Sequence, residues 1–390
     1  MHQLLRDFSV PAAFAGFITC LVGISVSAVL VIQTAQGLGA NQAQISSWFW
    51  ALCLGIGRCG LGLSWRFKYP VATSWSTAGL AMILASASNY SLHEAIGAFV
   101  VCGILTAILG FSGIFGRILA FIPTSLTAAM LGGVLLKFGV QLFSSLNESI
   151  GFIVLLLAVY VLSKRFMPRY SIVITVLAAM FSSPFFMVFE APQLSWGITH
   201  PVWMTPEFNL AAILGLALPL LVINMASQYL PGIAIIQAYG YQPHVKHLIG
   251  WTGAVQSLLA PFGCFSVNTA AISAAISLDD QAHPDPKRRY IAGMSSGLCY
   301  LLVALFAATL TQALLSFPNL LITAVAGIAL FGTISHNISL AFSDAEHREA
   351  ALITFLMSAS GVQFLNIGSA FWGLLLGLIV TLILRPKKAA

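Results

Sequence analysis

Charged side chains are scarce in this 390-residue chain. Asp, Glu, Lys and Arg make up 7% of the residues, whereas hydrophobic residues make up 59%. In soluble domains, roughly a quarter of all residues are charged. The mean hydropathy is +0.94, and apolar runs of about 20 residues, the length that spans a bilayer as a helix, recur from end to end. We therefore expect an all-α polytopic membrane protein.

Signatures of enzymes and of metal sites are also missing. The chain has no GxSxG or HExxH motif, no clustered metal ligands and no pair of acidic residues inside an apolar run. Its six cysteines lie in apolar runs without a CxxC motif, as small packing residues do. We expect no enzyme activity and no metal or other cofactor. The net charge of +6 is assigned to loops that face anionic lipid, so no nucleic-acid partner is expected.

Acidic residues are missing from the centre of every apolar run. All eleven lie in loops or near the ends of runs. A carboxylate within the membrane is costly, and where one occurs it usually marks an ion or proton pathway. A cationic substrate and a midplane carboxylate relay are therefore disfavoured, and an anionic substrate fits better.

Two apolar segments are interrupted at corresponding places in the chain. Residues 70–79 and 261–269 each open with a proline, pass through hydroxyl or amide residues, and only then become smoothly apolar. The two prolines, Pro70 and Pro261, lie 191 residues apart (261 − 70). Backbone that leaves helical geometry inside a bilayer must line a cavity or be buried in protein. Paired interruptions of this kind point to the substrate site of a transporter.

The apolar runs predict fourteen transmembrane spans. Their approximate limits are 10–32, 43–65, 70–87, 92–112, 118–137, 147–166, 170–190, 208–239, 247–262, 264–278, 288–314, 318–335, 347–362 and 364–384. The third and the tenth are too short to cross the bilayer as plain helix. Each is expected to be a short extended stretch followed by a half-helix.

Basic residues set the expected orientation. With both termini in the cytoplasm, 15 of the 17 Lys and Arg residues fall on the cytoplasmic side, as the positive-inside rule requires. The exceptions are Arg58, inside the second span towards its cytoplasmic end, and Lys137, at the outer end of the fifth span.

The two halves of the chain read as inverted repeats, residues 1–190 and residues 206–390. Seven spans is an odd number, so the second half enters the membrane with the opposite orientation. Pro123 and Pro318, each followed by a Thr-Ala sequence a few residues later, lie 195 residues apart (318 − 123). An inverted repeat places its two broken helices against each other near the midplane. The alternative, prolines and glycines that only kink helices, is typical of many membrane proteins.

Polar residues at the two breaks are the candidate substrate contacts. The N-termini of half-helices expose unpaired N–H groups and partial positive charge, which can hold a carboxylate without any Lys or Arg. The candidates are Ser74, Trp75, Ser76 and Thr77 in the first break, Phe265, Ser266, Asn268 and Thr269 in the second, Ser227 and Gln228 in the eighth span, and Ser25 and Ser27 in the first span. Packing of the two aromatic rings and bonding of hydroxyls to their own helix are equally open interpretations.

The chain resembles the BenE-type benzoate:proton symporter family over essentially its whole length. The matching motifs are Pro70-Val71 through Trp75-Ser76-Thr77, Glu94-Ala95-Ile96-Gly97, Ala128-Ala129-Met130-Leu131, Met225-Ala226-Ser227-Gln228 with Pro231-Gly232, Pro261-Phe262-Gly263, His283-Pro284-Asp285 and Gly368-Ser369-Ala370-Phe371-Trp372-Gly373. The family often has a proline after Trp-Ser-Thr, whereas this chain has Ala78. The start of the first half-helix is therefore expected to be less sharp.

The resemblance implies a fold and a function. The fold is that of nucleobase (UraA-like) transporters, with a core domain of spans 1–4 and 8–11 and a gate domain of spans 5–7 and 12–14. Substrate is held between the third, eighth and tenth spans, the core moves by an elevator mechanism, and the gate domain can form a homodimer. The function implied is import of an aromatic carboxylate with protons across a bacterial inner membrane.

Other functions on the same fold stay open. Nucleobase transport is less favoured, because nucleobase transporters carry acidic residues where this chain has Ser227 and Val267. A transporter of another organic or inorganic anion is the nearest alternative. An anion channel is the alternative from a different class.

Overall fold

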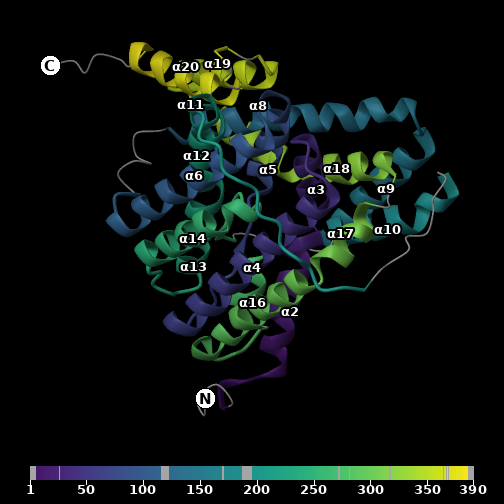
Figure 1. Ribbon diagram of the computed structural model, residues 1–390, viewed down its shortest axis with the longest axis vertical. Helices are drawn as coiled ribbons and strands as arrows, with labels where there is room; N and C mark the ends of the chain where they lie inside the picture. Colours follow the sequence, from purple (N-terminus) through teal and green to yellow (C-terminus); the bar gives the residue numbers. More distant parts are fainter. Residues whose placement is uncertain are drawn as a thin grey trace.

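The structure, a computed structural model, is almost entirely helical (Figure 1). It describes residues 6–25, 27–115, 123–168, 171–186, 196–270, 273–280, 282–315, 318–362, 364–365, 367 and 369–384. Within these residues, five helices are long and apolar enough to cross a bilayer. A sixth is counted if α16 and α17, which meet at a bend of 70°, are taken as one span.

The first half of the chain supplies ten helical elements and one strand among the described residues. They are α2 (Val10–Ser25), α3 (Ala28–Gly37), α4 (Gln42–Phe67), β1 (Thr73–Ser74), α5 (Thr77–Ala85), η1 (Ala87–Asn89), α6 (Leu92–Ser112), α8 (Thr124–Ser144), η2 (Ser145–Asn147), α9 (Ile150–Phe166) and α10 (Ser171–Phe186).

The second half is more interrupted. Its elements are α11 (Leu210–Ala212), η4 (Ile213–Ala217), α12 (Leu218–Asn224), η5 (Met225–Tyr229), α13 (Leu230–Ala238), α14 (Val245–Leu259), η6 (Ala260–Phe262), β2 (Asn268–Thr269), α15 (Ala274–Leu278), η7 (Pro286–Arg288), α16 (Tyr290–Leu305), α17 (Ala307–Leu315), α18 (Asn319–Ala341), α19 (Arg348–Ser360) and α20 (Ser369–Leu384). The elements α11 to α13 run on as one 29-residue span that contains two π-helical turns, η4 and η5.

Helix ends follow from local sequence. The side chain of Asn41 accepts from the N–H of Gln44 at the start of α4, and the side chain of Gln44 accepts from the N–H of Asn41. Ser91 and Glu94 form the same reciprocal pair at the start of α6. Such capping boxes satisfy two of the N–H groups that a helix start leaves unpaired.

The fifth span differs from the sequence-based expectation of residues 118–137. Its helix, α8, begins at Thr124 and continues to Ser144, while residues 116–122 lie outside the described part. Lys137 therefore lies seven residues before the helix end (144 − 137), about 10 Å inside it at 1.5 Å per residue. The charge of Lys137 lowers the local hydropathy without interrupting the helix.

Helix packing falls into two groups. In one, α6 packs on α14, and α16 packs on both α4 and α2. In the other, α8 packs on α18 and α19, α19 packs on α20, and α9 packs on α10. In Figure 1, α2, α4 and α16 lie near the N-terminus, and α19 and α20 lie at the opposite end of the molecule. Apolar side chains on the outer faces remain exposed, among them Phe181 and Phe185 of α10, as lipid-facing residues do.

Glu94 joins the start of α6 to the start of the broken eighth span. Its carboxylate accepts from the N–H of Ser91 at 2.8 Å and from Nδ2 of Asn209, whose own side chain caps α11. We expect Glu94→Ala to destabilise the protein by about 1–2 kcal/mol, because a capping interaction and a link between two spans are both lost.

The measurement is the unfolding midpoint of the purified protein in detergent. Glu148→Ala is the matched control, since Glu148 is an exposed acid outside the helices. Equal midpoints for the two variants would show that the Glu94 link contributes nothing measurable.

Candidate functional site

The two interruptions meet as a pair of antiparallel strands. Thr73 of β1 lies opposite Thr269 of β2, and Ser74 lies opposite Asn268. The N–H of Ala270 donates to the carbonyl of Ala72 at 2.9 Å, so the pairing continues past the strands. The backbone groups that the two breaks release from helices thus bond to each other, in the way that non-helical backbone within a membrane requires.

Hydroxyl groups tie the strand pair to three surrounding helices. Thr73 Oγ1 donates to the carbonyl of Ile56 on α4 at 2.8 Å. Thr269 Oγ1 donates to the carbonyl of Gln228 on η5 at 3.3 Å. The hydroxyl of Tyr229 donates to the carbonyl of Val267 at 3.0 Å and also contacts Thr252 Oγ1 of α14 at 2.8 Å. The pair is therefore fixed on both sides.

The first half-helix, α5, begins sharply even though Ala78 replaces the expected proline. Ser76 is its N-cap residue, and Ser76 Oγ accepts from the N–H of Gly79 at 3.0 Å. The N–H of Ser76 donates to Ser266 Oγ of the second break at 3.2 Å. A serine cap supplies the start signal that proline would have given.

Trp75 packs inside the protein. Its indole N–H donates to Ser27 Oγ at 2.6 Å, and Ser27 lies in the turn between α2 and α3. Its ring makes edge contacts with Phe49 and with Tyr300. Trp75 is 3% exposed, so nearly all of its ring surface is covered by other residues of the protein.

Phe265 is likewise part of an aromatic cluster, with ring-centroid distances of 6.3 Å to Trp48 and 6.2 Å to Phe99. It is fully buried. The packing interpretation of both aromatic residues therefore agrees with where the structure puts their rings.

The eighth span contributes a π-helical turn beside β2. Ser227 and Gln228 lie in η5, and Ser227 Oγ donates to the carbonyl of Ile223 at 2.7 Å. Single π turns frequently occur at functional sites. Gly232, one turn further on, lies so close to Thr269 that an added Cβ would come within 2.5 Å of Thr269 Oγ1.

The predicted site residues come together from four spans. Four of the twelve keep accessible surface, namely Ser74, Thr77, Ser227 and Gln228. Seven are buried, namely Ser27, Trp75, Ser76, Phe265, Ser266, Asn268 and Thr269. The side chain of Ser25 lies outside the described part of the structure. Of the predicted site residues, four are thus accessible to a ligand and seven are covered by protein.

Three buried amides hold polar atoms without a hydrogen-bond partner among the described residues. The atoms are Oδ1 of Asn268, Oε1 of Gln256, and both Oδ1 and Nδ2 of Asn224. All three residues are 0% exposed. A buried unpaired polar atom costs about 1–3 kcal/mol, so each such group calls for an explanation. Asn224 is four residues from Leu220, which contacts the first turn of α5 at Gly79, so both lie on the same face of α12.

Sequence reasoning did not choose Tyr229 or Asn224 as site residues. Tyr229 follows Gln228 directly and is fully buried with its hydroxyl between two spans. The available signal was its position directly after three polar residues, Asn224, Ser227 and Gln228, which are unusual in the middle of an apolar span.

The family model for the benzoate membrane transport protein matches residues 6–383. The chain belongs to the benzoate membrane transport family. It is 39% identical over 387 residues to the inner membrane protein YdcO of Escherichia coli K12, covering 98% of each chain. It is 35% identical over 391 residues to the benzoate membrane transport protein of Acinetobacter baylyi, covering 100% of this chain and 99% of the relative. The protein is thus a membrane transporter by family and not an enzyme.

Solved structures of anion transporters share the fold. The transmembrane domain of the cyanobacterial bicarbonate transporter BicA superimposes with a TM-score of 0.61 at 12% identity, covering 97% of both chains. SLC26A9 superimposes with a TM-score of 0.64 at 13% identity, covering 97% of this chain and 66% of that one. This chain thus spans about two thirds of the length of SLC26A9. At such low identity the likeness is one of fold.

We expect Trp75→Phe to act on stability rather than on substrate affinity. The change removes the bond to Ser27 and leaves a small cavity beside Tyr300, which together cost about 1–3 kcal/mol. The unfolding midpoint in detergent should fall, while the half-saturating substrate concentration of uptake stays within about twofold. A tenfold loss of affinity at an unchanged midpoint would instead place the Trp75 ring against the substrate.

Proposed function

We propose that this member of the family is a secondary transporter of the bacterial inner membrane that imports an aromatic carboxylate such as benzoate together with protons. The family membership and the relative from Acinetobacter baylyi support the substrate class. The main structural support for the proposed site is the β1–β2 pair, because it brings both breaks and η5 together.

The chemistry of this place suits a carboxylate. The N–H groups of Thr77 and Ala78 lie in the first turn of α5 and have no hydrogen-bond partner among the described residues, whereas the N–H of Gly79 donates to Ser76 Oγ. Helix N-termini carry partial positive charge and bind anions. Around them, Ser74, Thr77 and Gln228 add hydroxyl and amide donors on accessible surface.

The coupled proton needs a group that can carry it. The residues that form the strand pair and η5 include no carboxylate and no histidine. The proton would therefore be carried with the substrate's own carboxylate or on a group at the end of a helix.

The proposed topology is fourteen spans in two inverted repeats, residues 1–190 and 206–390, with both termini in the cytoplasm. The strand residues support the repeat, because adding 195 to Thr73 and Ser74 gives Asn268 and Thr269. The same offset relates Pro123 and Pro318, which cap α8 and α18.

The two packing groups support a core of spans 1–4 and 8–11 and a gate of spans 5–7 and 12–14. The contacts of α6 with α14, and of α16 with α2 and α4, fall within the core, and those among α8, α18, α19 and α20 fall within the gate. An elevator movement of the core against the gate and a homodimer through the gate belong to the same proposal.

Transport of another small anion on the same fold is the second candidate. The observation in its favour is the structural likeness to a bicarbonate transporter and to SLC26A9. Competition of labelled benzoate uptake by unlabelled anions separates the two.

The deciding experiment is uptake of labelled benzoate into proteoliposomes with and without an inward proton gradient. We expect saturable uptake that the gradient drives and a protonophore abolishes. Empty liposomes give the passive diffusion of benzoic acid. Current without saturation or proton dependence would indicate a channel, and no uptake above empty liposomes would exclude benzoate.

Gln228→Ala should raise the half-saturating benzoate concentration about tenfold, since a hydrogen bond to a charged group contributes about 1.5–3 kcal/mol. The unfolding midpoint should not move, because the side chain is half-buried. Gln237→Ala is the matched control on the exposed end of α13. Wild-type affinity in both variants would remove Gln228 from the site.

A further inference from the structure

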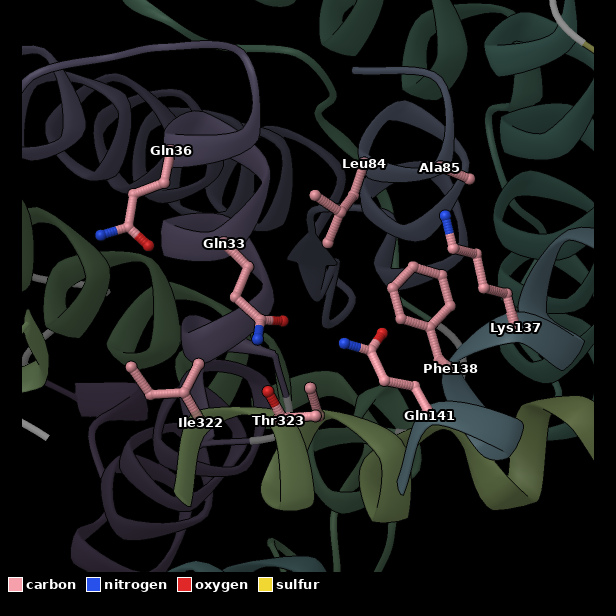
Figure 2. Close-up of a pocket in the computed structure, with 10 residues that line it drawn as sticks. Gln33, Gln36, Leu84, Ala85, Lys137, Phe138, Gln141, Ile322 and Thr323 are labelled. Carbon is pink, nitrogen blue, oxygen red and sulfur yellow. The ribbon is translucent and has the colours of Figure 1, made fainter. Parts of the chain in front are cut away.

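A cavity of about 400 Å³ borders α8. Its walls come from α3 and α5 on one side and from α8 and α18 on the other, with Gln33, Gln36, Lys137, Phe138, Gln141 and Thr323 among the residues that line it (Figure 2). The cavity touches α5 at Leu84 and Ala85, the last two residues of that helix. Thr77, where α5 leaves the strand pair, is eight residues away, or about 12 Å along the axis. The cavity is therefore separate from the strand pair.

Lys137 is a charged residue within a helix, and its side chain is exposed where α8 borders the cavity. It lies about 10 Å inside α8. Lys137 and Arg58 are the two basic residues that the predicted topology does not place on the cytoplasmic side. Among the residues that the structure describes, it takes part in no ion pair. Ionisable groups within spans are rare, face cavities and mark the paths of substrates or ions. The position of Lys137 at this cavity agrees with that rule.

The other lining residues make the cavity suitable for an amphipathic anion. Gln33, Gln141 and Thr323 provide neutral hydrogen-bonding groups, and the lining residues include no acidic side chain. Figure 2 shows Gln33 and Gln141 pointing toward one another across the space, with the ring of Phe138 next to Lys137. The apolar part of the wall comes from Leu84, Phe138 and Ile322. One cation, several donors and an aromatic wall match a ring that bears one carboxylate.

We infer that this cavity is a second binding site for a small aromatic carboxylate, in which Lys137 binds the carboxylate and Phe138 packs against the ring. The inference rests on the proposed function. In the proposed orientation, the cavity lies on the outer side of the strand pair. Substrate binds here first and then passes along α5 to the strand pair when the core moves against the gate.

A structural role for Lys137 is the competing explanation. Figure 2 shows its ammonium group reaching toward Ala85 at the C-terminal end of α5, where a cation is favourable for the helix. That role needs no ligand. It predicts no preference between anionic and cationic reagents in the cavity and no effect of benzoate on their reaction.

Thiol labelling of Gln141→Cys tests the site without relying on transport. The purified full-length protein is treated with thiosulfonate reagents that are alike except for a negative or a positive charge. We expect the negative reagent to react faster, the ratio of the two rates to fall about tenfold when Lys137→Gln is added, and benzoate to slow labelling only while Lys137 is present. The parent protein gives the background, because five of its six cysteines are buried and Cys299 is half-buried.

Equal rates for the two reagents, or labelling that benzoate does not slow in a protein that transports benzoate, would overturn the second site. Absence of both benzoate uptake and benzoate protection would instead overturn the proposed substrate, while a charge preference that depends on Lys137 would still identify an anion site.

Uptake kinetics provide the second readout. Lys137→Gln should raise the KM for benzoate about tenfold with kcat changed less than twofold, and Lys137→Arg should restore the KM. Arg58→Gln, which removes the other cation of a span from outside the cavity, should leave the KM unchanged. A fall in kcat and in the unfolding midpoint, with the same KM, would assign Lys137 the structural role alone.

Discussion

The bonding between β1 and β2 is the constraint on which the rest of this protein depends. A bilayer offers no partners for peptide N–H and C=O groups, so two broken helices can exist at membrane depth only if their backbones satisfy each other or are buried by protein. Here both conditions hold, because the strands pair and the hydroxyls of Thr73, Thr269 and Tyr229 fix them to α4, η5 and α14. This anchoring sets the direction of the half-helix α5 and the positions of Ser74, Thr77 and Gln228.

In the proposed site, the same arrangement would hold an anion without a formal positive charge beside it. The buried side chains of Ser76 and Ser266 organise the first turn of α5, and the free N–H groups there supply the positive potential. Lys137 lies elsewhere, at the cavity between α3 and α5 on one side and α8 and α18 on the other. A full charge at the strand pair would bind the substrate more tightly but would also slow its release. In the proposed second site, the lysine lies one half-helix away, which would separate capture of the substrate from its transfer.

Much of this could be predicted from the sequence, since proline and hydroxyl residues in an apolar run mark a break in any membrane helix. The positions of both breaks, the extended stretches and the start of the eighth span agree with the structure. The π turn η5 could not be predicted, because the hydrogen-bond shift that makes it leaves no trace in hydrophobic periodicity. The length of α8 was misjudged, because hydropathy falls at Lys137 while the backbone continues undisturbed. The rings of Trp75 and Phe265 were ambiguous, since packing and ligand contact require the same residues.

The distance along the chain between β1 and β2 has a consequence for biogenesis. The backbone of Thr73 has no strand partner until the ribosome has synthesised Thr269. At about 5–20 residues per second, those 196 residues (269 − 73) take roughly 10–40 s. During that interval the nascent first half holds an incomplete third span in the membrane, with peptide groups that only water, the insertion machinery or a temporary helix can satisfy. Assembly of the strand pair is therefore a late event in the synthesis of the protein, and an N-terminal fragment that ends before β2 carries no site.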